Sequence, residues 1–358
     1  MRVLHVLTRD YRRGAEIFGL GLHEALRAAG HESSVVALAP APPGHQPGGV
    51  PALGTAGTRD PRTLRALRRR TRAADVVVAH GSDTLLACRL ALLRSPVPFV
   101  YVNIGDPLHW TASLSRRLRV RWMLAGAARV GAVAPSAVER LVNHLGIPAE
   151  RVRFTGNGRD SSHFRPADPA ERAAGRARWS LPPTAPVAVA VANLAAEKRL
   201  DVAVRAVGAR PHWYLLVVGT GPREADLHAL AHRAAPGRVV FTGELDDVRP
   251  ALHAADVALL TSTTEGLPGA LLEAAMTGLP VVATNVGFVP DLVLDGRTGV
   301  LVPVGDPQAT ANGLRRAQEN RFEWGPAGRA HAVQLFDAPT VVERWTALLF
   351  EVSGPLVR

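Results

Sequence analysis

The strongest constraint on the fold is a repeated pattern in which a short apolar run, a turn with glycine or proline, and an amphipathic segment follow one another. In the first half, the apolar runs are residues 3–7, 34–38, 75–79 and 99–102, and the amphipathic segments are residues 15–29 and 84–93. Continuous apolar strands that alternate with helices are typical of a parallel sheet covered on both faces. The pattern predicts a doubly wound α/β domain.

The same alternation begins again after a stretch rich in proline, alanine and arginine at residues 164–186. The second series of expected strands comprises residues 187–191, 213–218, 239–242, 257–260, 280–283 and 299–302. We therefore predict two α/β domains, residues 1–166 and residues 167–338. Ligands of such domains bind at the carboxyl ends of the strands, which makes the cleft between the domains the expected site.

Composition excludes several classes of protein. The 358 residues include a single cysteine, Cys88, and residues 1–8 lack the apolar length of a signal peptide, which together predict a reducing, cytoplasmic location. The longest apolar run, residues 185–196, is about a dozen residues long, whereas a helix needs roughly 20 to cross a bilayer. The 13 histidines show no metal-ligand spacing, and no serine, histidine and acid spacing indicates an acyl-transfer triad. Metal hydrolases and serine hydrolases are therefore not supported.

Charge points to an anionic partner. The formal net charge is +11, from 42 Lys and Arg residues against 31 Asp and Glu residues, which suits a ligand that carries phosphates or an anionic surface. Lys198 is the only lysine of the sequence. An ammonium and a guanidinium are not interchangeable, so this lysine is either a chance survivor or a residue whose compact charge is needed.

The densest group of chemical signals follows the strand expected at residues 257–260. Hydroxyls at residues 261–264, Glu265 and a glycine and proline turn precede a helix that is expected to begin near Gly269, and Glu273 lies about one turn inside it. Free N–H groups at a helix start bind anions, and carboxylates accept hydrogen bonds from sugar hydroxyls. With Lys198 at the end of another strand, these residues predict a sugar-nucleotide site. The alternative is that Glu265 caps the helix and Glu273 is a solvated surface residue.

The two acids separated by seven residues, and the sequence Glu273-Ala-Ala-Met-Thr-Gly-Leu-Pro-Val-Val-Ala-Thr284 that follows, resemble the retaining glycosyltransferases of family 4. Further matches are Val217-Val-Gly-Thr-Gly-Pro222, Gly156-Asn-Gly158 and Asn193-Leu-Ala-Ala-Glu-Lys198. The resemblance covers nearly the whole chain and implies the GT-B architecture, in which two Rossmann-like, doubly wound parallel-sheet domains face each other across a cleft. It also implies that the last helix, from about residue 339 to residue 358, packs back on the first domain.

The activity implied by the resemblance is transfer of a sugar from a nucleoside diphosphate donor with retained anomeric configuration. UDP-sugars are favoured over GDP- and dTDP-sugars, and the acceptor is a small molecule, a glycan or a lipid-linked sugar. No cofactor is expected. No metal is expected either, because the adjacent acids Asp246 and Asp247 do not form the Asp-x-Asp spacing that would hold an ion between phosphates.

The resemblance assigns roles to individual residues. Lys198 and Glu265 are the expected catalytic residues: Lys198 stabilises the departing diphosphate, and Glu265 holds hydroxyls of the donor sugar. Glu273 is expected to hold the ribose. The other expected donor contacts are Gly14, Asn193, Gly243, Leu245, Gly266, Leu267, Pro268, Gly269 and Ala270, and the expected acceptor-side contacts are Glu16, Asn103 and His109.

One departure from the family pattern concerns charge. The family usually carries an arginine five residues before its lysine, whereas this chain has Asn193 there. Arg199, or an arginine from the first domain, is expected to supply the missing charge. Two other readings stay open: a sugar-nucleotide epimerase on the same scaffold, and a non-catalytic sugar-nucleotide-binding or assembly protein.

Two basic helices raise the question of a surface partner. One expected helix carries five arginines on one side, and the other carries four arginines among Leu114, Leu118 and Trp122. The first set is Arg62, Arg65, Arg68, Arg69 and Arg72, and the second set is Arg116, Arg117, Arg119 and Arg121. One hypothesis is that such a surface rests on anionic lipid at the inner face of the membrane, and the alternative is a plain solvated face. Nucleic acid is not expected, because the few aromatic residues do not alternate with the basic ones as a stacking platform would.

Overall fold

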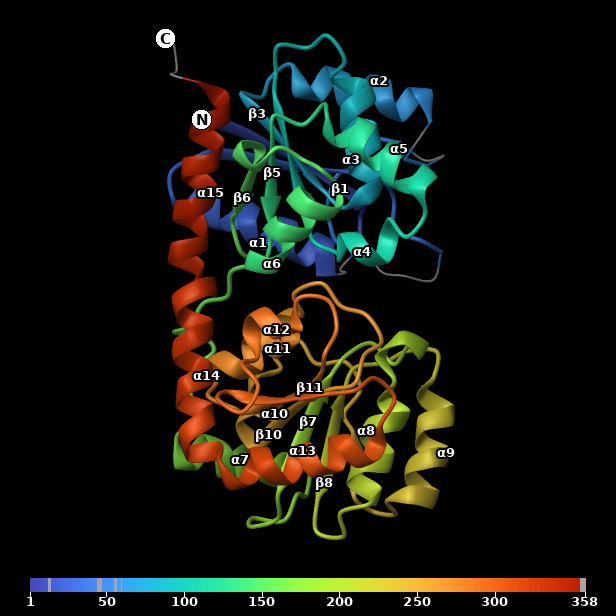
Figure 1. Cartoon of the computed structure of the whole chain (residues 1–358), viewed down its shortest axis with the longest axis vertical. Coiled ribbons are helices and arrows are strands. Elements are labelled where there is room, and N and C mark those ends of the chain that lie inside the picture. The colour runs from blue at the N-terminus through green and yellow to red at the C-terminus, as the bar shows by residue number, and fades with distance from the viewer. Residues whose placement is uncertain (12–13, 44–46, 55–56, 59, 355–358) are drawn as a thin grey trace. The chain divides into compact units, whose positions relative to one another are not determined.

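The computed structural model describes residues 1–11, 14–43, 47–54, 57–58 and 60–354. The chain forms two compact units (Figure 1): unit 1 is Met1–Gly158 with the C-terminal segment that begins at Ala338, and unit 2 is Arg159–Asp337. The boundary lies before the position expected after residue 166. Residues 159–166 belong to unit 2 because they bond to it: the Arg159 N–H donates to the Phe336 carbonyl at 3.0 Å, and the Ser161 N–H donates to Asp337 Oδ1 at 3.0 Å.

Unit 1 is built on a parallel sheet with the strand order β2-β1-β3-β4-β5-β6. Its strands are β1 (Arg2–Arg9), β2 (Glu32–Ala39), β3 (Val76–His80), β4 (Phe99–Asn103), β5 (Arg129–Ala132) and β6 (Val152–Phe154). The first four match the apolar runs in the sequence. Strands β5 and β6 were not predicted, because they are short, with four and three residues, and each contains an arginine.

The helices of unit 1 include its C-terminal helix. They are α1 (Gly14–Ala28), α2 (Pro61–Thr71), α3 (Ser82–Ala91), α4 (Pro107–Trp110), α5 (Leu114–Leu124), α6 (Pro135–Glu139) and α15 (Ala338–Ser353), with one π-helical turn (Arg140–His144) and one 3-10 turn (Ala149–Arg151). Helix α3 contacts both α2 and α5, and α15 contacts α1. Trp345 of α15 is fully buried and lies over Gly131 of β5, where a Cβ would come within 2.7 Å of the indole.

Unit 2 has a second parallel sheet, with the strand order β12-β11-β10-β7-β8-β9. Its strands are β7 (Val187–Val191), β8 (Tyr214–Val218), β9 (Val239–Phe241), β10 (Val257–Leu260), β11 (Val281–Thr284) and β12 (Gly299–Val302). Its helices are α7 (Pro169–Arg178), α8 (Leu200–Gly208), α9 (Glu224–Ala234), α10 (Arg249–Ala254), α11 (Gly269–Met276), α12 (Val289–Leu292), α13 (Pro307–Glu319) and α14 (Arg321–Phe336), with a 3-10 turn η3 (Ala196–Lys198). All six strands agree with those predicted from the sequence.

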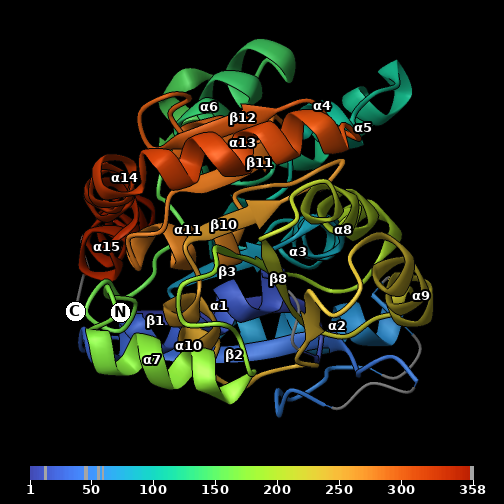
Figure 2. The ribbon, with the colours of Figure 1, turned by 90° about the horizontal axis from the view of Figure 1, so that it is seen from below.

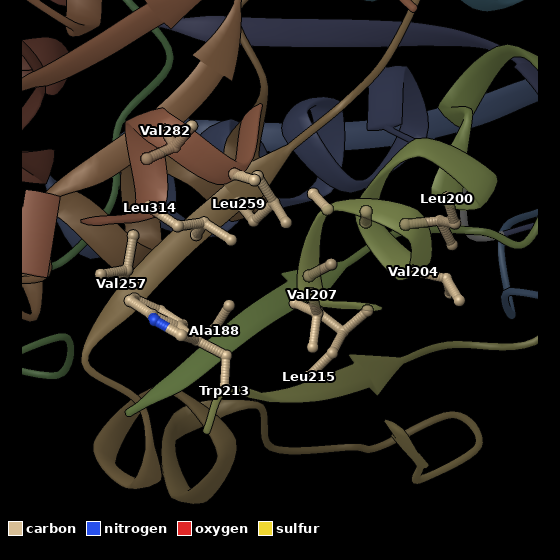
Figure 3. Packing of buried hydrophobic residues seen from close by; sticks show 14 of the residues in the cluster. Ala188, Leu200, Val204, Val207, Trp213, Leu215, Val257, Leu259, Val282 and Leu314 are labelled. Carbon is tan, nitrogen blue, oxygen red and sulfur yellow. The ribbon is translucent and has the colours of Figure 1, made fainter. Parts of the chain in front are cut away.

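The core of unit 2 lies between the sheet and a layer formed by α8, α9 and α13. Figure 3 shows part of this cluster, in which Val204 and Val207 of α8 and Leu314 of α13 face residues of β7, β8 and β10. Helices α7 and α10 lie side by side (Figure 2). Because strand side chains alternate between faces, each strand of this sheet is apolar on both sides, which explains the continuous apolar runs in the sequence.

The order of the strands locates the expected ligand site in unit 2. From β7 the chain proceeds to β8 and β9 in one direction along the sheet, and from β10 to β11 and β12 in the other. Strands β7 and β10 are neighbours, and the connections that leave their carboxyl ends diverge. In open α/β sheets, ligands bind at this topological switch point. Among the described residues, no helix is both long and apolar enough to cross a membrane.

Candidate functional site

Lys198 and Glu265 meet at the switch point of unit 2. Lys198 lies in the connection from β7 to α8, and Glu265 lies in the connection from β10 to α11. The Lys198 Nζ lies 2.6 Å from Glu265 Oε1, and their side chains are 24% and 9% exposed. The Ser262 hydroxyl donates to the same Oε1 at 2.6 Å. Both of these bonds end on Oε1 of the Glu265 carboxylate.

Hydrogen bonds between the two loops hold the pair in place. The Thr261 hydroxyl donates to the Lys198 carbonyl at 2.9 Å, and the Thr263 N–H donates to the Glu197 carbonyl at 2.8 Å. The Thr284 hydroxyl, at the end of β11, donates to the Ser262 carbonyl at 2.7 Å. The run of hydroxyls after β10 therefore fastens one loop to the other, and the position of Lys198 relative to Glu265 is set by the main chain.

A glycine on a third loop lies against the main chain of Glu265. Gly287 has a φ of +53°, and a Cβ at this position would lie 1.9 Å from the Glu265 carbonyl oxygen. The Phe288 N–H donates to the Gly266 carbonyl at 3.3 Å. Because only glycine allows both this conformation and this approach, Gly287 helps to define where the Glu265 carboxylate lies.

Helix α11 begins at Gly269, as the sequence predicts, and follows directly after the turn that carries Glu265. Its first turn has N–H groups without carbonyl partners inside the helix, which is a general property of helix N-termini. Gly266, Leu267, Pro268 and Ala270 belong to this turn and helix start, as expected. The helix dipole adds partial positive charge at the same end. The arrangement is suited to an anion such as a phosphate.

Glu273, one turn into α11, is paired with an arginine that the sequence analysis did not identify. The Arg159 Nε donates to Glu273 Oε1 at 2.6 Å, and both side chains are 17% exposed. A Cβ on Gly269 would lie 2.3 Å from Nη2 of Arg159, so the guanidinium lies along the first turn of the helix. No local motif indicates this contact, because the partners are 114 residues apart in the sequence.

The other expected donor residues of unit 2 lie at the same edge of the sheet. Asn193 follows β7 and is exposed, with its Oδ1 2.4 Å from where a Cβ on Gly221 would be. Gly243, with a φ of +71°, follows β9, and its carbonyl accepts from the Gly219 N–H at 2.8 Å. Leu245 is half-buried two residues later. Neighbouring strands lie about 4.8 Å apart, so the end of β9 is roughly 10 Å from the end of β7.

Four expected site residues belong to unit 1, and their roles stay predictions. Gly14 is the first residue of α1 and has open space at its Cβ position, and Glu16 in the same helix is 6% exposed. Asn103 ends β4 and is fully buried, with its Nδ2 donating to the Gly105 carbonyl at 3.0 Å. His109 lies in α4 and is exposed.

The arginine expected to replace the charge missing at Asn193 is otherwise engaged. Arg199, with a φ of +45°, forms two bonds to Asp201, at 2.9 and 3.0 Å. It ends the turn η3 and begins α8. The arginine that lies against the start of α11 is Arg159, from the first segment of unit 2.

Within the described ranges, no group of three or more His, Cys, Asp or Glu side chains is placed to hold a metal ion.

A cavity of about 710 Å³ lies at the other end of the sheet, next to the starts of β10 and β11. It is lined among others by Asp256, Pro280 and Phe322. None of the Lys198 and Glu265 site residues lines this cavity, so it is separate from the switch point.

Two Rossmann-like units, each with a six-stranded parallel sheet, define the GT-B class of glycosyltransferase folds. The crystal structure of Anabaena HepE in complex with UDP matches with a TM-score of 0.85 and 20% identity, over 98% of this chain and 100% of that chain. Its complex with UDP-glucose matches with a TM-score of 0.84 and 21% identity. At this level of identity, the likeness shows the fold.

The family follows from the sequence comparisons. Residues 12–163 match the profile described as Glycosyltransferase Family 4, and residues 185–320 match the one described as Glycosyl transferases group 1. The chain belongs to this family of glycosyltransferases.

Two curated relatives indicate how far the similarity extends. The lipopolysaccharide core biosynthesis glycosyltransferase LpsE of Rhizobium meliloti is 32% identical over 222 residues, which are 60% of this chain and 62% of that protein. A D-inositol 3-phosphate glycosyltransferase of Streptomyces bingchenggensis is 32% identical over 233 residues, which are 60% of this chain and 50% of that protein. The matched region therefore spans between half and about three fifths of the length of these relatives.

Proposed function

We propose that the protein transfers a sugar from a nucleoside diphosphate sugar to an acceptor, with retention of the anomeric configuration. The observation that carries this proposal is the Lys198 and Glu265 pair, 2.6 Å apart, beside the N-terminal turn of α11. An ammonium and a row of backbone amides suit a diphosphate, and a carboxylate oxygen suits a sugar hydroxyl. A sugar nucleotide combines both groups in one molecule.

The proposed chemistry is electrostatic. When the bond between the sugar and the diphosphate breaks, negative charge grows on the departing phosphate. Lys198 and the amides of the α11 start are fixed in advance by the loop contacts, so they stabilise this charge without having to reorganise. Glu265 holds donor hydroxyls through Oε2, and Lys198 and Ser262 keep its carboxylate oriented.

A uridine nucleotide is the proposed donor, with hexose as the transferred sugar. Support comes from HepE, which has the same fold and whose solved complexes contain UDP and UDP-glucose. We further propose that no metal ion is needed, because Lys198 and the helix start supply the positive charge that a divalent cation supplies in other phosphate sites. Activity that is unchanged by EDTA is the expected result, and activity lost with EDTA and restored by Mg²⁺ or Mn²⁺ would contradict this part.

The test of the proposed function is a screen with UDP-, GDP- and dTDP-sugars that measures binding by calorimetry and nucleoside diphosphate release over hours. Wild type is expected to bind at least one nucleotide. It is also expected to hydrolyse a nucleotide-sugar donor slowly and thereby to release the nucleoside diphosphate. Epimerised donor without release would favour an epimerase. Binding without any turnover, with or without candidate acceptors, would favour a non-catalytic binder.

For the acceptor, we propose a lipid-borne molecule that is reached from an anionic membrane surface. Helix α5 turns its apolar stripe outward: Leu114, Leu118 and Trp122 are 68%, 57% and 52% exposed. These positions are four residues apart and share one face of the helix. Arg116, Arg119 and Arg121 are exposed on the same helix, which has no acidic residue. An apolar stripe flanked by arginines is the pattern of helices that lie in a membrane interface.

Neighbouring elements extend the same surface. Leu90 and Leu93, at the end of α3, are 41% and 52% exposed, and Arg89 of α3 lies over the Trp122 ring at 5.3 Å. Helix α2, the other arginine-rich helix, has Leu67 fully buried, and its surface is basic without an apolar stripe. The membrane proposal therefore rests on α5 and applies to a cytoplasmic protein at the inner leaflet.

Co-sedimentation with vesicles tests the membrane proposal. Wild type is expected to bind vesicles that contain phosphatidylglycerol and not pure phosphatidylcholine, and to bind less as salt rises. The double variant Leu118→Gln with Trp122→Gln is expected to lose most of this binding. Phe322→Gln, which changes an 80% exposed aromatic in unit 2, is the matched control. Equal binding by the α5 variant, or no binding by wild type, would contradict the proposal.

A further inference from the structure

The cavity at the starts of β10 and β11 has the size and the walls of a ligand site. Its volume of about 710 Å³ falls within the range of about 300–1,000 Å³ that is common for small-molecule sites. Its walls are mostly apolar, and Leu252, Ala255 and Leu279 among them are buried. An apolar space of this size can hold an organic molecule, whereas ordered waters need polar partners.

Helix α14 forms one long side of the cavity. Its lining residues run from Arg321 to Val333, which corresponds to a length of about 18 Å along a helix. Pro326 and Ala330 lie between these two residues and are exposed, so the cavity opens to solvent along the helix. This elongated outline suits a chain better than a compact ring system.

The ionised groups of the cavity carry an excess of positive charge. They are three arginines and one acid: Arg172, Arg321, Arg329 and Asp256. Asp256 already pairs with Arg172 and with Arg176. The hydrogen bonds of Arg321 and Arg329 within the described ranges all end on carbonyl oxygens. The charges of these two arginines are therefore not compensated by any carboxylate of the described residues.

Arg321 is the arginine that has N–H donors left for a ligand. Arg329 uses both of its Nη atoms for carbonyls, whereas Arg321 donates only from Nη1, to the Gln318 carbonyl at 3.2 Å. The Arg321 guanidinium lies over the Phe322 ring, 4.1 Å from its centre, and this contact helps to hold it in place. Phe322 is 80% exposed and lines the cavity, so it adds apolar surface next to the charge.

We propose that this cavity binds an anionic amphiphile with a single acyl chain. Its carboxylate or phosphate contacts Arg321, and its chain runs along α14 toward Val333. An apolar cavity with uncompensated arginines at its wall is complementary to a ligand that has an apolar body and a negative end. The site lies at the opposite end of the unit 2 sheet from Lys198 and Glu265, and it does not depend on the proposed function.

Calorimetry with three single-chain amphiphiles tests the chemistry of the site. The probes are dodecanoate, dodecyl phosphate and dodecyltrimethylammonium, each kept below the concentration at which it forms micelles. Wild type is expected to bind at least one of the two anions, with about one molecule per chain and at least about tenfold more tightly than the cation. The anion that binds more tightly identifies the head group. Binding of neither anion, or equal binding of the cation, would overturn the proposal.

Substitutions on α14 test where the amphiphile binds. Ala330→Trp places an indole at the cavity wall and is expected to weaken anion binding at least about tenfold. The same change at Ala229, on the exposed face of α9, is the matched control. Arg321→Gln is expected to weaken anion binding about fivefold or more, because it removes a charged donor. Arg315→Gln, which changes an exposed arginine of α13, is its control and is expected to have no effect.

The exposed apolar stripe of α5 is the competing place for an amphiphile. The double variant Leu118→Gln with Trp122→Gln is therefore expected to bind the anion as wild type does. Loss of binding in this variant, or wild-type affinity in a folded Arg321→Gln variant, would overturn the proposal. Melting curves establish which variants are folded. If Ala330→Trp does not melt cooperatively, the result for Arg321→Gln decides alone, since the Arg321 side chain bonds to a single carbonyl.

Discussion

The Nζ of Lys198 lies 2.6 Å from Oε1 of Glu265, although 67 residues separate them in the sequence. The contact joins the loops that leave β7 and β10 at the point where the strand order of unit 2 reverses. Both side chains are largely shielded from water, so their attraction is screened less than that of a surface pair. We propose that this ammonium, together with the helix start, binds a phosphate.

Replacing Lys198 is expected to remove most of the activity. Lys198→Ala deletes one charged donor to the departing diphosphate and is expected to lower kcat about 100-fold or more, as the loss of one such donor does in other enzymes. Lys198→Arg is expected to remain impaired, because a planar guanidinium does not replace a compact ammonium next to Glu265. Initial rates of nucleoside diphosphate release measure the effect, with melting curves as the control for folding. Wild-type rates in Lys198→Ala would refute the assigned role.

Gly287 is expected to be needed for the position of Glu265. In Gly287→Ala, the new Cβ would lie 1.9 Å from the Glu265 carbonyl oxygen, so the loop must move. We expect a loss of more than about 2 kcal/mol in unfolding free energy and a reduced kcat. Gly296→Ala is the control, since Gly296 also has a positive φ, +70°, but open space at its Cβ position. Urea unfolding and rate measurements on both variants test this, and equal effects would show that backbone strain alone is responsible.

Asp256 is expected to be a main contributor to the stability of unit 2. It accepts bonds from Arg172 at 2.6 Å, from Arg176 at 2.8 Å and from the Val187 N–H at 2.8 Å, and its side chain is 7% exposed. Asp256→Ala leaves two guanidinium groups without their carboxylate, and removing one partner of a buried pair costs about 3–5 kcal/mol.

The exposed pair of Asp247 and Arg249 provides the comparison for Asp256. Asp247→Ala is expected to cost less than about 1 kcal/mol, because surface ion pairs contribute little. Urea denaturation of the two variants gives both free energies. Similar values for Asp256→Ala and Asp247→Ala would contradict the account of the buried cluster.

Unit 1 is expected to lose stability in mild acid because of a buried histidine pair. His5 Nδ1 and His80 Nε2 lie 2.9 Å apart, and burial lowers the pKa of His80 to about 3 and that of His5 well below its usual value. The unfolded chain, with histidine pKa values near 6.5, binds more protons than the folded one below that pH. Stability is therefore full above about pH 6.5 and falls as the pH drops toward the folded values, by up to about 1.4 kcal/mol per pH unit for each histidine.

Urea midpoints at pH 7.5 and pH 5.5 measure this effect. The double variant His5→Leu with His80→Leu is expected to show a smaller decrease in midpoint than wild type between these pH values. His23 and His31, whose pKa values burial also lowers, are present in both proteins. Carboxylates with lowered pKa values, such as Asp75, act only at lower pH. An identical decrease in the two proteins would exclude the histidine pair as the cause.

Much of the fold could be predicted because the information is local. The strands of unit 2 are continuous apolar runs, and the start of α11 is marked by Pro268 and Gly269. The pairing of Lys198 with Glu265 was also accessible, because both residues follow strands of one parallel sheet, whose carboxyl ends share an edge. The order of strands and helices along the chain was therefore enough to predict that Lys198 and Glu265 lie close together.

The remainder depends on contacts between distant segments. Strands β5 and β6 are short and contain Arg129 and Arg153, so their pattern resembles that of loops. Arg159 stands in a stretch without periodicity, and its partner Glu273 belongs to a helix formed much later in the chain. Arg199, or an arginine from the first domain, was expected to supply the missing charge, whereas the Arg199 side chain is bonded to Asp201. Such contacts are set by tertiary packing.

The central claim, that Lys198 binds the phosphates of a nucleotide, has a direct test because this sequence contains no other lysine. Mild acetylation with acetic anhydride, followed by peptide mass spectrometry, reports the reactivity of the Lys198 amine with the N-terminal amine as an internal reference. The account predicts that saturating UDP, or the nucleoside diphosphate that the protein prefers, slows acetylation of Lys198 at least about tenfold. The matching nucleoside is expected to leave it unchanged. Acetylation of Lys198 at the same rate with and without the bound diphosphate would contradict the account.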